Sequence, residues 1–232
     1  MRFAGKKKSK EESIPDAEEK EKGSDEKPPV IMVVSPSGGG DAESKSPRCV
    51  GLVGDITEEK SSEVLYGLLS LRHTAKKLAP VDPEDPESEL KEVHDPIEMM
   101  ISTHGGNAGD MFAIYDIMRL IKDEGTAVNT FGVGKVMSAG VLVLAAGTKG
   151  NRKIGKHCRV MIHGVSSGAG GQIQDLDNEM EEIKQIEDQY ISALAAETDM
   201  TKRYIKNLMK KKLNVYIGAQ EAVDLGIADI IF

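Results

Sequence analysis

The sequence predicts an α/β fold on three observations. Short apolar stretches alternate along the chain with longer segments that have helical periodicity. Glycine-rich turns join these segments, and the 232 residues include 24 glycines. Apolar residues make up 39% of the chain, but aromatic residues only 4%, so the core must be built from Val, Ile, Leu, Met and Ala. Strands that alternate with helices in this way are typical of α/β architecture.

Residues 1–47 are expected to form a charged, disordered arm. The segment is rich in Lys, Glu, Asp, Ser, Pro and Gly, and its single apolar patch is Val30–Val34. So little apolar surface cannot offset the entropy that ordering would cost. The folded domain is therefore expected to span residues 48–232.

The first elements of this domain have clear local signals. Cys49–Val53 is apolar and predicts a buried strand. Thr57 is a suitable N-cap for a helix that runs to about His73. Residues 74–95 contain three prolines and many acidic residues, which indicates an exposed insertion.

The remaining elements continue the alternation. Further strands are expected over residues 96–101, 127–132, 159–163 and 227–231. Helices are expected over the segment that contains Met111 to Ile121, and over 141–146, 172–197, 202–212 and 220–225. Tight or glycine-rich turns are expected at 102–106, 134–140 and 164–171.

Ser138 lies in a turn that opens a buried helix. A serine hydroxyl attacks a carbonyl carbon only when a base removes its proton and nearby donors stabilise the oxyanion. At a helix start the hydroxyl can be exposed, and the following amide can face the developing charge. The alternative is that Ser138 merely caps the helix. The lipase motif G-x-S-x-G is not matched, because Val136 stands where its first glycine is needed.

His163 and the Gly105–Gly106 pair are further candidates for a site. His163 ends an apolar strand before a glycine-rich loop, where an imidazole can act as a general base. The alternative is a partly buried histidine that bonds to the backbone. The two glycines follow a strand and can present amides to an anion, or they can simply form a turn with positive φ.

Several motifs then occur in a fixed order. Ile101–Asn107 is similar to I-N-S-P-G-G-x, Gly134–Gly140 to G-Q-A-A-S-M-G, and Arg159–His163 is the same as R-V-M-I-H. Residues 145–150 are similar to T-A-G-A-K-G, and residues 221–229 to E-A-x-x-Y-G-L-V-D. In order and spacing over residues 48–231, the chain resembles the Clp (ClpP) family of serine peptidases.

The resemblance implies a set of site residues. Ser138 would be the nucleophile and His163 its general base. The backbone amides of Gly106 and Ala139 would form the oxyanion hole. The residues that would bind the substrate peptide as an added strand are Gly105, Gly164, Val165 and Ser166.

The resemblance also implies a fold and an assembly. The fold would be a ClpP/crotonase-like spiral of ββα units with a protruding handle helix in the region 164–197. This helix would lock together two stacked heptameric rings, and unfolded or threaded polypeptides would be cut in their chamber. The enzyme would need no cofactor, since ATP would be used only by a partner unfoldase of the AAA+ class.

Asn214 stands where the family has its catalytic Asp. An Asn oxygen can accept a hydrogen bond from the histidine, but it cannot supply a full negative charge. The same replacement in a serine enzyme built for Asp lowers kcat about 10⁴-fold. We therefore expect either a slow Ser-His-Asn enzyme or help from another carboxylate, with Asp175 and Asp177 as candidates. In the alternative, Asn214 only caps a turn and the subunit is catalytically weak.

Other departures keep further hypotheses open. His104 replaces a proline, and Glu98–Met100 replaces tyrosine-rich residues that help the family receive its ATPase. Asn214 and the altered docking surface motivate a non-catalytic ring subunit, whereas the arm and the insertion are compatible with a phage-type processing protease. A Ser-Lys dyad with Lys149 and a crotonase-type acyl-CoA enzyme are the less favoured alternatives.

Composition narrows the choice of partners and compartment. The net charge is −8 and no basic segment with interleaved aromatic residues is present, so nucleic acid is not an expected partner. The most apolar run, Val141–Ala146, is far too short to cross a membrane. Cys49 and Cys158 are isolated and suggest neither a disulfide framework nor a zinc site. The cytoplasm is the expected compartment.

Overall fold

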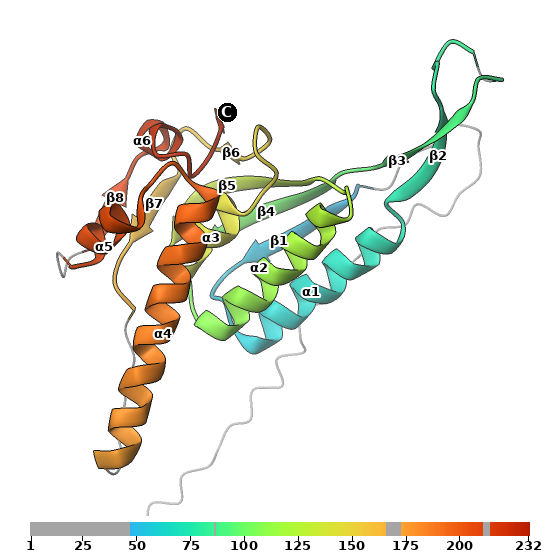
Figure 1. Cartoon of the computed structure of the whole chain (residues 1–232). Helices are drawn as coiled ribbons and strands as arrows, with labels where there is room; N and C mark the ends of the chain where they lie inside the picture. The colour runs from blue at the N-terminus through green and yellow to red at the C-terminus, as the bar shows by residue number, and fades with distance from the viewer. Residues whose placement is uncertain (1–46, 86, 166–172, 211–213) are drawn as a thin grey trace, which may run out of the picture. The chain divides into compact units, whose positions relative to one another are not determined.

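A mostly parallel sheet carries the fold of the computed structural model (Figure 1), which describes residues 47–85, 87–165, 173–210 and 214–232. Five of its strands lie in the order β1, β4, β5, β6, β9, while β7 pairs with β5 and β8. Only the β7–β8 pair is antiparallel. The strands are β1 (Cys49–Val53), β4 (Ile97–Thr103), β5 (Val128–Met137), β6 (Lys153–Ile154), β7 (Arg159–Ile162), β8 (Val215–Ile217) and β9 (Ile230–Ile231). The predicted α/β class is confirmed.

Two helices cover one face of this sheet. Helices α1 (Glu58–His73) and α2 (Ala108–Asp123) lie side by side against β1, β4 and β5 (Figure 1). The predicted N-cap is confirmed, since the Thr57 side chain accepts a hydrogen bond from the Lys60 amide. Asn107 caps α2 in the same way through the Asp110 amide. The two caps therefore fix the residue at which each helix begins.

The core is formed where the apolar faces of these layers meet. Side chains of β1 and β4 alternate between buried and exposed, as expected for strands with one face on the core. The sequence predicted that Cys49–Val53 is buried throughout, and this is wrong: only Val50 and Leu52 are buried, because their side chains are on the face of β1 that packs on the core. Large side chains that are fully buried include Leu52, Leu68, Met99, Ile101, Ile114, Met118 and Leu142.

The segment 74–95 contains a hairpin that was not predicted. Strands β2 (Lys76–Pro80) and β3 (Leu90–His94) pair in antiparallel register and extend away from the sheet (Figure 1). The Val81 amide still donates to the Glu89 carbonyl at 2.8 Å beyond the Pro80–Leu90 pair, so the missing amide of Pro80 does not interrupt the ladder. Most of the hairpin is exposed, as expected for an insertion.

The end of β5 also departs from the expected turn at 134–140. The strand continues to Met137, and its pairing with β4 shifts register between Ile101 and Thr103. Gly134 has a positive φ of 66°, which lets the backbone bulge without ending the strand. The first part of β5 pairs with β6 and the last part with β7. Because of the bulge, β5 ends beside β7, and Ser138, the residue after Met137, lies near the end of β7.

Four helices complete the described chain. Helix α3 (Ala139–Ala145) is buried along its whole length and packs against β5, α2 and α4. Helix α4 (Ile173–Glu197) runs from α3 to well beyond the sheet (Figure 1), as the resemblance to a handle helix implies. Helices α5 (Lys202–Lys210) and α6 (Ala219–Asp224) follow. None of the helices in the described part of the chain combines the length and apolar character that crossing a membrane requires.

Arg152 ties the ends of α3 and α4 to Asp229, the residue before β9. Its guanidinium is only 4% exposed and bonds both carboxylate oxygens of Asp229, at 2.9 and 2.5 Å. It also donates to the carbonyl oxygens of Ala145, at the end of α3, and Glu197, at the end of α4. Burial would raise the pKa of Asp229, but the hydrogen bonds from Arg152 and Gly150 outweigh it and hold the pKa below its ordinary value.

The pair Arg152–Asp229 makes stability depend on pH. Because the pKa of Asp229 is lowered in the folded state, its contribution is fully present above about pH 4 and is lost as the pH falls through the folded-state pKa. We expect Asp229→Asn to lower the free energy of unfolding by about 3 kcal/mol at neutral pH, since Arg152 then stays buried without its counter-ion. When urea unfolding is measured from neutral to acid pH, the free energy of unfolding should fall less for the variant than for the unmodified chain.

Asp188→Asn is the matched control. Asp188 pairs with Lys206 at 2.7 Å, but both side chains are largely exposed. Its removal should leave the unfolding free energy at neutral pH nearly unchanged. Equal effects of the two variants would contradict the role given to Arg152.

Candidate active site

Ser138 lies at the junction of β5 and α3 in a strained conformation. It has φ 54° and ψ −124°, and it is the only non-glycine residue with positive φ in the described chain. Such conformations cost about 1–3 kcal/mol and cluster at functional sites. The Ser138 amide donates to the Met161 carbonyl on β7 at 2.7 Å. Ser138 is the N-cap residue of α3 by position, but its hydroxyl makes no capping hydrogen bond and so does not merely cap the helix.

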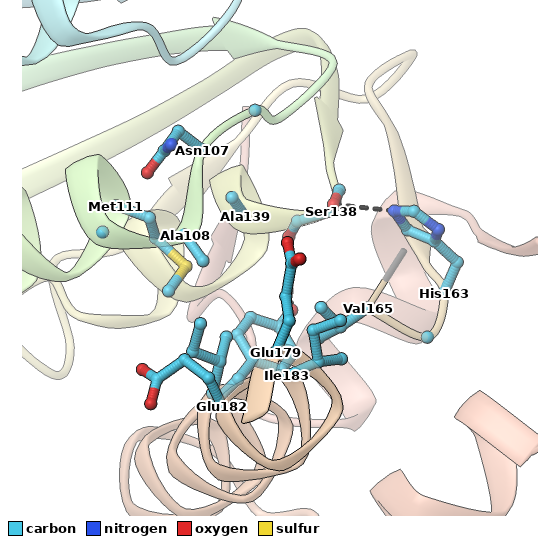
Figure 2. Close-up of a pocket in the computed structure, with 15 residues that line it drawn as sticks. Asn107, Ala108, Met111, Ser138, Ala139, His163, Val165, Glu179, Glu182 and Ile183 are labelled. Carbon is cyan, nitrogen blue, oxygen red and sulfur yellow. Dashed lines mark hydrogen bonds between the residues drawn. The ribbon is translucent and has the colours of Figure 1, made fainter. Parts of the chain in front are cut away.

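The Ser138 hydroxyl instead meets His163. The distance from Ser138 Oγ to His163 Nε2 is 2.7 Å, which is within the range of a strong hydrogen bond (Figure 2). The register of β5 and β7 pairs Met137 with Met161, so the two side chains extend from the carboxyl ends of adjacent parallel strands. When the hydroxyl donates, the imidazole accepts at Nε2 and carries its hydrogen at Nδ1. This is the arrangement that general-base activation of a serine requires.

Gly105 allows the preceding loop to pack directly on Ser138. A Cβ at residue 105 would lie 2.6 Å from Ser138 Cβ and 2.9 Å from the Met137 carbonyl oxygen. Its φ of 100° is also unfavourable for other residues. The turn is therefore restricted to glycine by close approach to the nucleophile's backbone.

Gly106 is fixed by its contact with Ile56. A Cβ at Gly106 would overlap the Ile56 carbonyl, and φ at Gly106 is 151°. The Ile56 amide donates to the Gly105 carbonyl at 2.8 Å, and the Asn107 amide donates to the Ile56 carbonyl at 2.9 Å. The backbone on both sides of Gly106 is thus held, while its own amide is not used.

Two unused amides therefore lie beside the serine. Neither the Gly106 amide nor the Ala139 amide donates to an acceptor within the described residues. Both residues line the same pocket as Ser138 and His163. Fixed amides next to a nucleophile can stabilise an oxyanion without reorganisation.

The pocket has a volume of about 340 Å³ and lies between α2, α3 and α4. Met111, Ile183, Ile186 and Tyr190 give it an apolar wall. Glu179 and Glu182 of α4 also line it, and the Glu179 side chain extends toward Ser138 (Figure 2). Other lining residues are Asn107, Ala108, Gly109, Gly164 and Val165. Among the described side chains, no cluster of His, Cys, Asp and Glu is suited to hold a metal ion.

The expected peptide-binding residues have different placements. Gly164 and Val165 line the pocket without regular secondary structure, and Gly105 packs against Ser138. Ser166, the fourth of them, lies outside the described residues. The same holds for the rest of the loop to Gly171.

Asn214 is close to His163 in register but does not bond to it. Val160, Met161 and Ile162 of β7 pair with Ile217, Tyr216 and Val215 of β8. Continued by one residue, this antiparallel register sets residue 163 opposite residue 214. Asn214 is exposed, and within the described chain no hydrogen bond joins it to His163. Asp175 and Asp177 are likewise exposed on α4 and make no such bond.

One residue of the site was not found from the sequence. Tyr190 of α4 donates its phenolic hydrogen to the Ser138 carbonyl oxygen at 3.2 Å. The only local signal was its place, with Ile183 and Ile186, on the apolar side of a long helix. That pattern indicates burial, and it does not indicate which group the hydroxyl meets.

Comparisons with known proteins point to one family. A family model described as Clp protease matches residues 88–232. Two similar proteins are the ATP-dependent Clp protease proteolytic subunits 1 of Prochlorococcus marinus subsp. pastoris (strain CCMP1986 / NIES-2087 / MED4) and Prochlorococcus marinus (strain MIT 9312). Each is 30% identical over 184 residues, which cover 79% of this chain and 83% of the relative.

Substituting Gly106 tests the rigid turn. Gly106→Ala places a methyl group against the Ile56 backbone, so the backbone at one of these two residues must move. Gly150→Ala is the matched control, because Gly150 has φ 87° but no atom within 4 Å of the added Cβ. We expect Gly150→Ala to cost about 1–2 kcal/mol of unfolding free energy from backbone strain alone. Thermal and urea unfolding should give a clearly larger loss for Gly106→Ala; equal losses would contradict the close packing described.

Proposed function

This chain belongs to the Clp protease family of serine-type peptidases, and from that premise we propose that it cleaves polypeptides with Ser138 as nucleophile and His163 as general base. The observation that carries the proposal is the 2.7 Å contact between Ser138 Oγ and His163 Nε2. The strained backbone of Ser138 and the two unused amides beside it add independent support.

In the proposed mechanism, His163 accepts and returns the proton in both half-reactions. Ser138 Oγ attacks the scissile carbonyl carbon while its proton passes to His163 Nε2. The carbonyl oxygen becomes an oxyanion, which accepts hydrogen bonds from the amides of Gly106 and Ala139. The intermediate collapses as His163 returns the proton to the leaving amine, and an acyl-enzyme remains. Water, deprotonated by His163, then attacks the ester carbonyl; as the bond to Ser138 Oγ breaks, His163 returns the proton to Oγ and the peptide acid is released.

The substrate proposed for this site is an extended polypeptide. Gly164 and Val165 border the pocket as an irregular segment after β7, where a peptide can add as a strand. We include Gly105 and Ser166 in this binding region. An extended chain presents its carbonyl groups to a backbone oxyanion hole, which a folded protein does not do.

The proposed setting is a ring-shaped homo-oligomer. Helix α4 extends beyond the sheet (Figure 1), which suits a handle between two stacked heptameric rings. The chamber so formed would admit unfolded or threaded chains, delivered by an AAA+ unfoldase that hydrolyses ATP, while the subunit itself uses no cofactor. The thiols of Cys49 and Cys158 are both free, which fits the cytoplasm as its compartment.

Asn214 is proposed as the group that orients His163. The β7–β8 register supports this, since it sets the two positions opposite each other. The alternative is a catalytically weak ring subunit, and it is favoured by one observation: within the described residues, no side chain bonds His163 Nδ1. A processing protease of the phage type would use the same chemistry on a different substrate. A Ser-Lys dyad has less support, since Lys149 is exposed and Ser138 Oγ bonds a histidine.

Covalent labelling tests the nucleophile. We expect a fluorophosphonate to modify Ser138, because among the described residues only this hydroxyl has a base and an oxyanion site beside it. Mass spectrometry should locate the adduct at Ser138, and Ser138→Ala should abolish both labelling and peptide cleavage. His163→Ala should reduce cleavage at least about 10⁴-fold. Ser70→Ala, at an exposed serine of α1, is the control and should change neither. Undiminished cleavage by Ser138→Ala would refute the proposal.

Restoring a carboxylate tests Asn214. Asn214→Asp supplies the negative charge that stabilises the imidazolium, so cleavage should rise, by at most about 10⁴-fold. Asn214→Ala should lower it, because the amide oxygen no longer holds the histidine. Steady-state kcat on a fluorogenic peptide separates the outcomes. If both variants match the unmodified chain, Asn214 only caps a turn and the third catalytic group is elsewhere.

A further inference from the structure

One half of the proposed oxyanion hole belongs to the peptide group between Ser138 and Ala139. This peptide is trans, so its carbonyl and its amide hydrogen point in nearly opposite directions. Whatever holds the Ser138 carbonyl therefore also sets the direction of the Ala139 amide. Rotation of the plane by half a turn would present a carbonyl oxygen, instead of a donor, to the oxyanion.

Two donors hold this carbonyl. The Val141 amide in the first turn of α3 donates to it at 3.0 Å. The Tyr190 hydroxyl of α4 donates to it at 3.2 Å, from a residue 52 positions away in the chain. The Val141 contact joins residues three positions apart, so it constrains the strained Ser138 backbone only weakly. The second comes from another element of the core.

Tyr190 is well suited to a fixed role. Its side chain is 6% exposed and belongs to the main hydrophobic core. Burial raises the pKa of its phenol, so the group stays protonated and can only donate to the carbonyl oxygen. No described side chain other than Tyr190 donates to the Ser138 carbonyl. Within the described chain, the Tyr190 hydroxyl has a single hydrogen-bonding partner, and that partner is the backbone of the nucleophile.

We propose that Tyr190 is a positioning residue, which holds the Ser138–Ala139 peptide plane so that the Ala139 amide faces the oxyanion. The proposal rests on the proposed function of Ser138. It gives α4 a direct connection to the catalytic centre, since the helix supplies both a wall of the pocket and the donor that orients the peptide plane. Tyr190 touches neither the substrate's reacting atoms nor the nucleophilic oxygen, and so acts through the backbone.

The variant Tyr190→Phe removes this donor and keeps the ring in the core. The matched control is Tyr115→Phe, since Tyr115 is also a partly buried tyrosine whose hydroxyl has a single partner, Glu197, at 3.1 Å. Tyr115 lies on α2 and its hydroxyl is bonded away from the pocket. Both variants lose one phenol, but only one of them loses a contact to the catalytic backbone.

Four quantities are measured for each variant: kcat and KM on a fluorogenic peptide, the Ki of a peptide aldehyde, and the Ki of the corresponding non-reactive peptide amide. The aldehyde forms a tetrahedral adduct that uses the oxyanion hole, whereas the amide does not. Loss of one oxyanion donor lowers kcat about 10²–10³-fold in other enzymes, so loosening one should lower it about 10-fold or more. For Tyr190→Phe we expect this fall in kcat, an equal rise in the aldehyde Ki, and no change in KM or the amide Ki.

Several outcomes would overturn the inference. The first is an unchanged kcat in Tyr190→Phe, and the second is a rise in its KM and amide Ki with no change in kcat or aldehyde Ki. The third is a fall in kcat for Tyr115→Phe equal to that for Tyr190→Phe. Rates are expressed per site titrated with fluorophosphonate, so partial unfolding lowers the titre and leaves the rate per site unaffected. If the unmodified chain is not labelled at Ser138, the proposed function itself fails. If it is labelled and Tyr190→Phe behaves like the control, only the role of Tyr190 fails.

Discussion

The backbone at Ser138 is the constraint on which the rest of the site depends. Its positive φ costs about 1–3 kcal/mol and is maintained only because the surroundings determine it from several sides. β7 accepts its amide hydrogen, α3 and α4 donate to its carbonyl, and His163 accepts its hydroxyl hydrogen. Every polar group of this residue is thus committed, and the two amides next to it remain for a ligand.

Close packing around that residue explains why glycines surround it. Gly105 touches Ser138 from one side, and Gly140 approaches the Thr103 side chain so closely that a Cβ there would overlap it. Because α3 is buried along its whole length, it anchors the strained turn in the core. Arg152 then links the far ends of α3 and α4 to Asp229. The nucleophile is therefore held by packed elements of the core.

The sequence predicted the larger elements because their periodicity is local. Strands of two or three residues, such as β6 and β8, have no period to detect. The end of β5 was predicted to be a turn because a glycine usually interrupts a strand, whereas Gly134 forms a bulge within it. Ser138, His163, Gly106 and Ala139 followed from the family resemblance. Tyr190 did not, since its contact joins residues that are 52 positions apart, and the partner of His163 Nδ1 depends on side-chain positions that no motif specifies.

The most direct measurement for the central claim is an experimental structure of the covalent adduct with a phosphonate inhibitor. The account predicts phosphorus bonded to Ser138 Oγ and a phosphonyl oxygen about 2.7–3.1 Å from the amide nitrogens of both Gly106 and Ala139. His163 Nε2 should remain beside the modified oxygen. A phosphonyl oxygen directed away from both amides, or an adduct on any other residue, would contradict it.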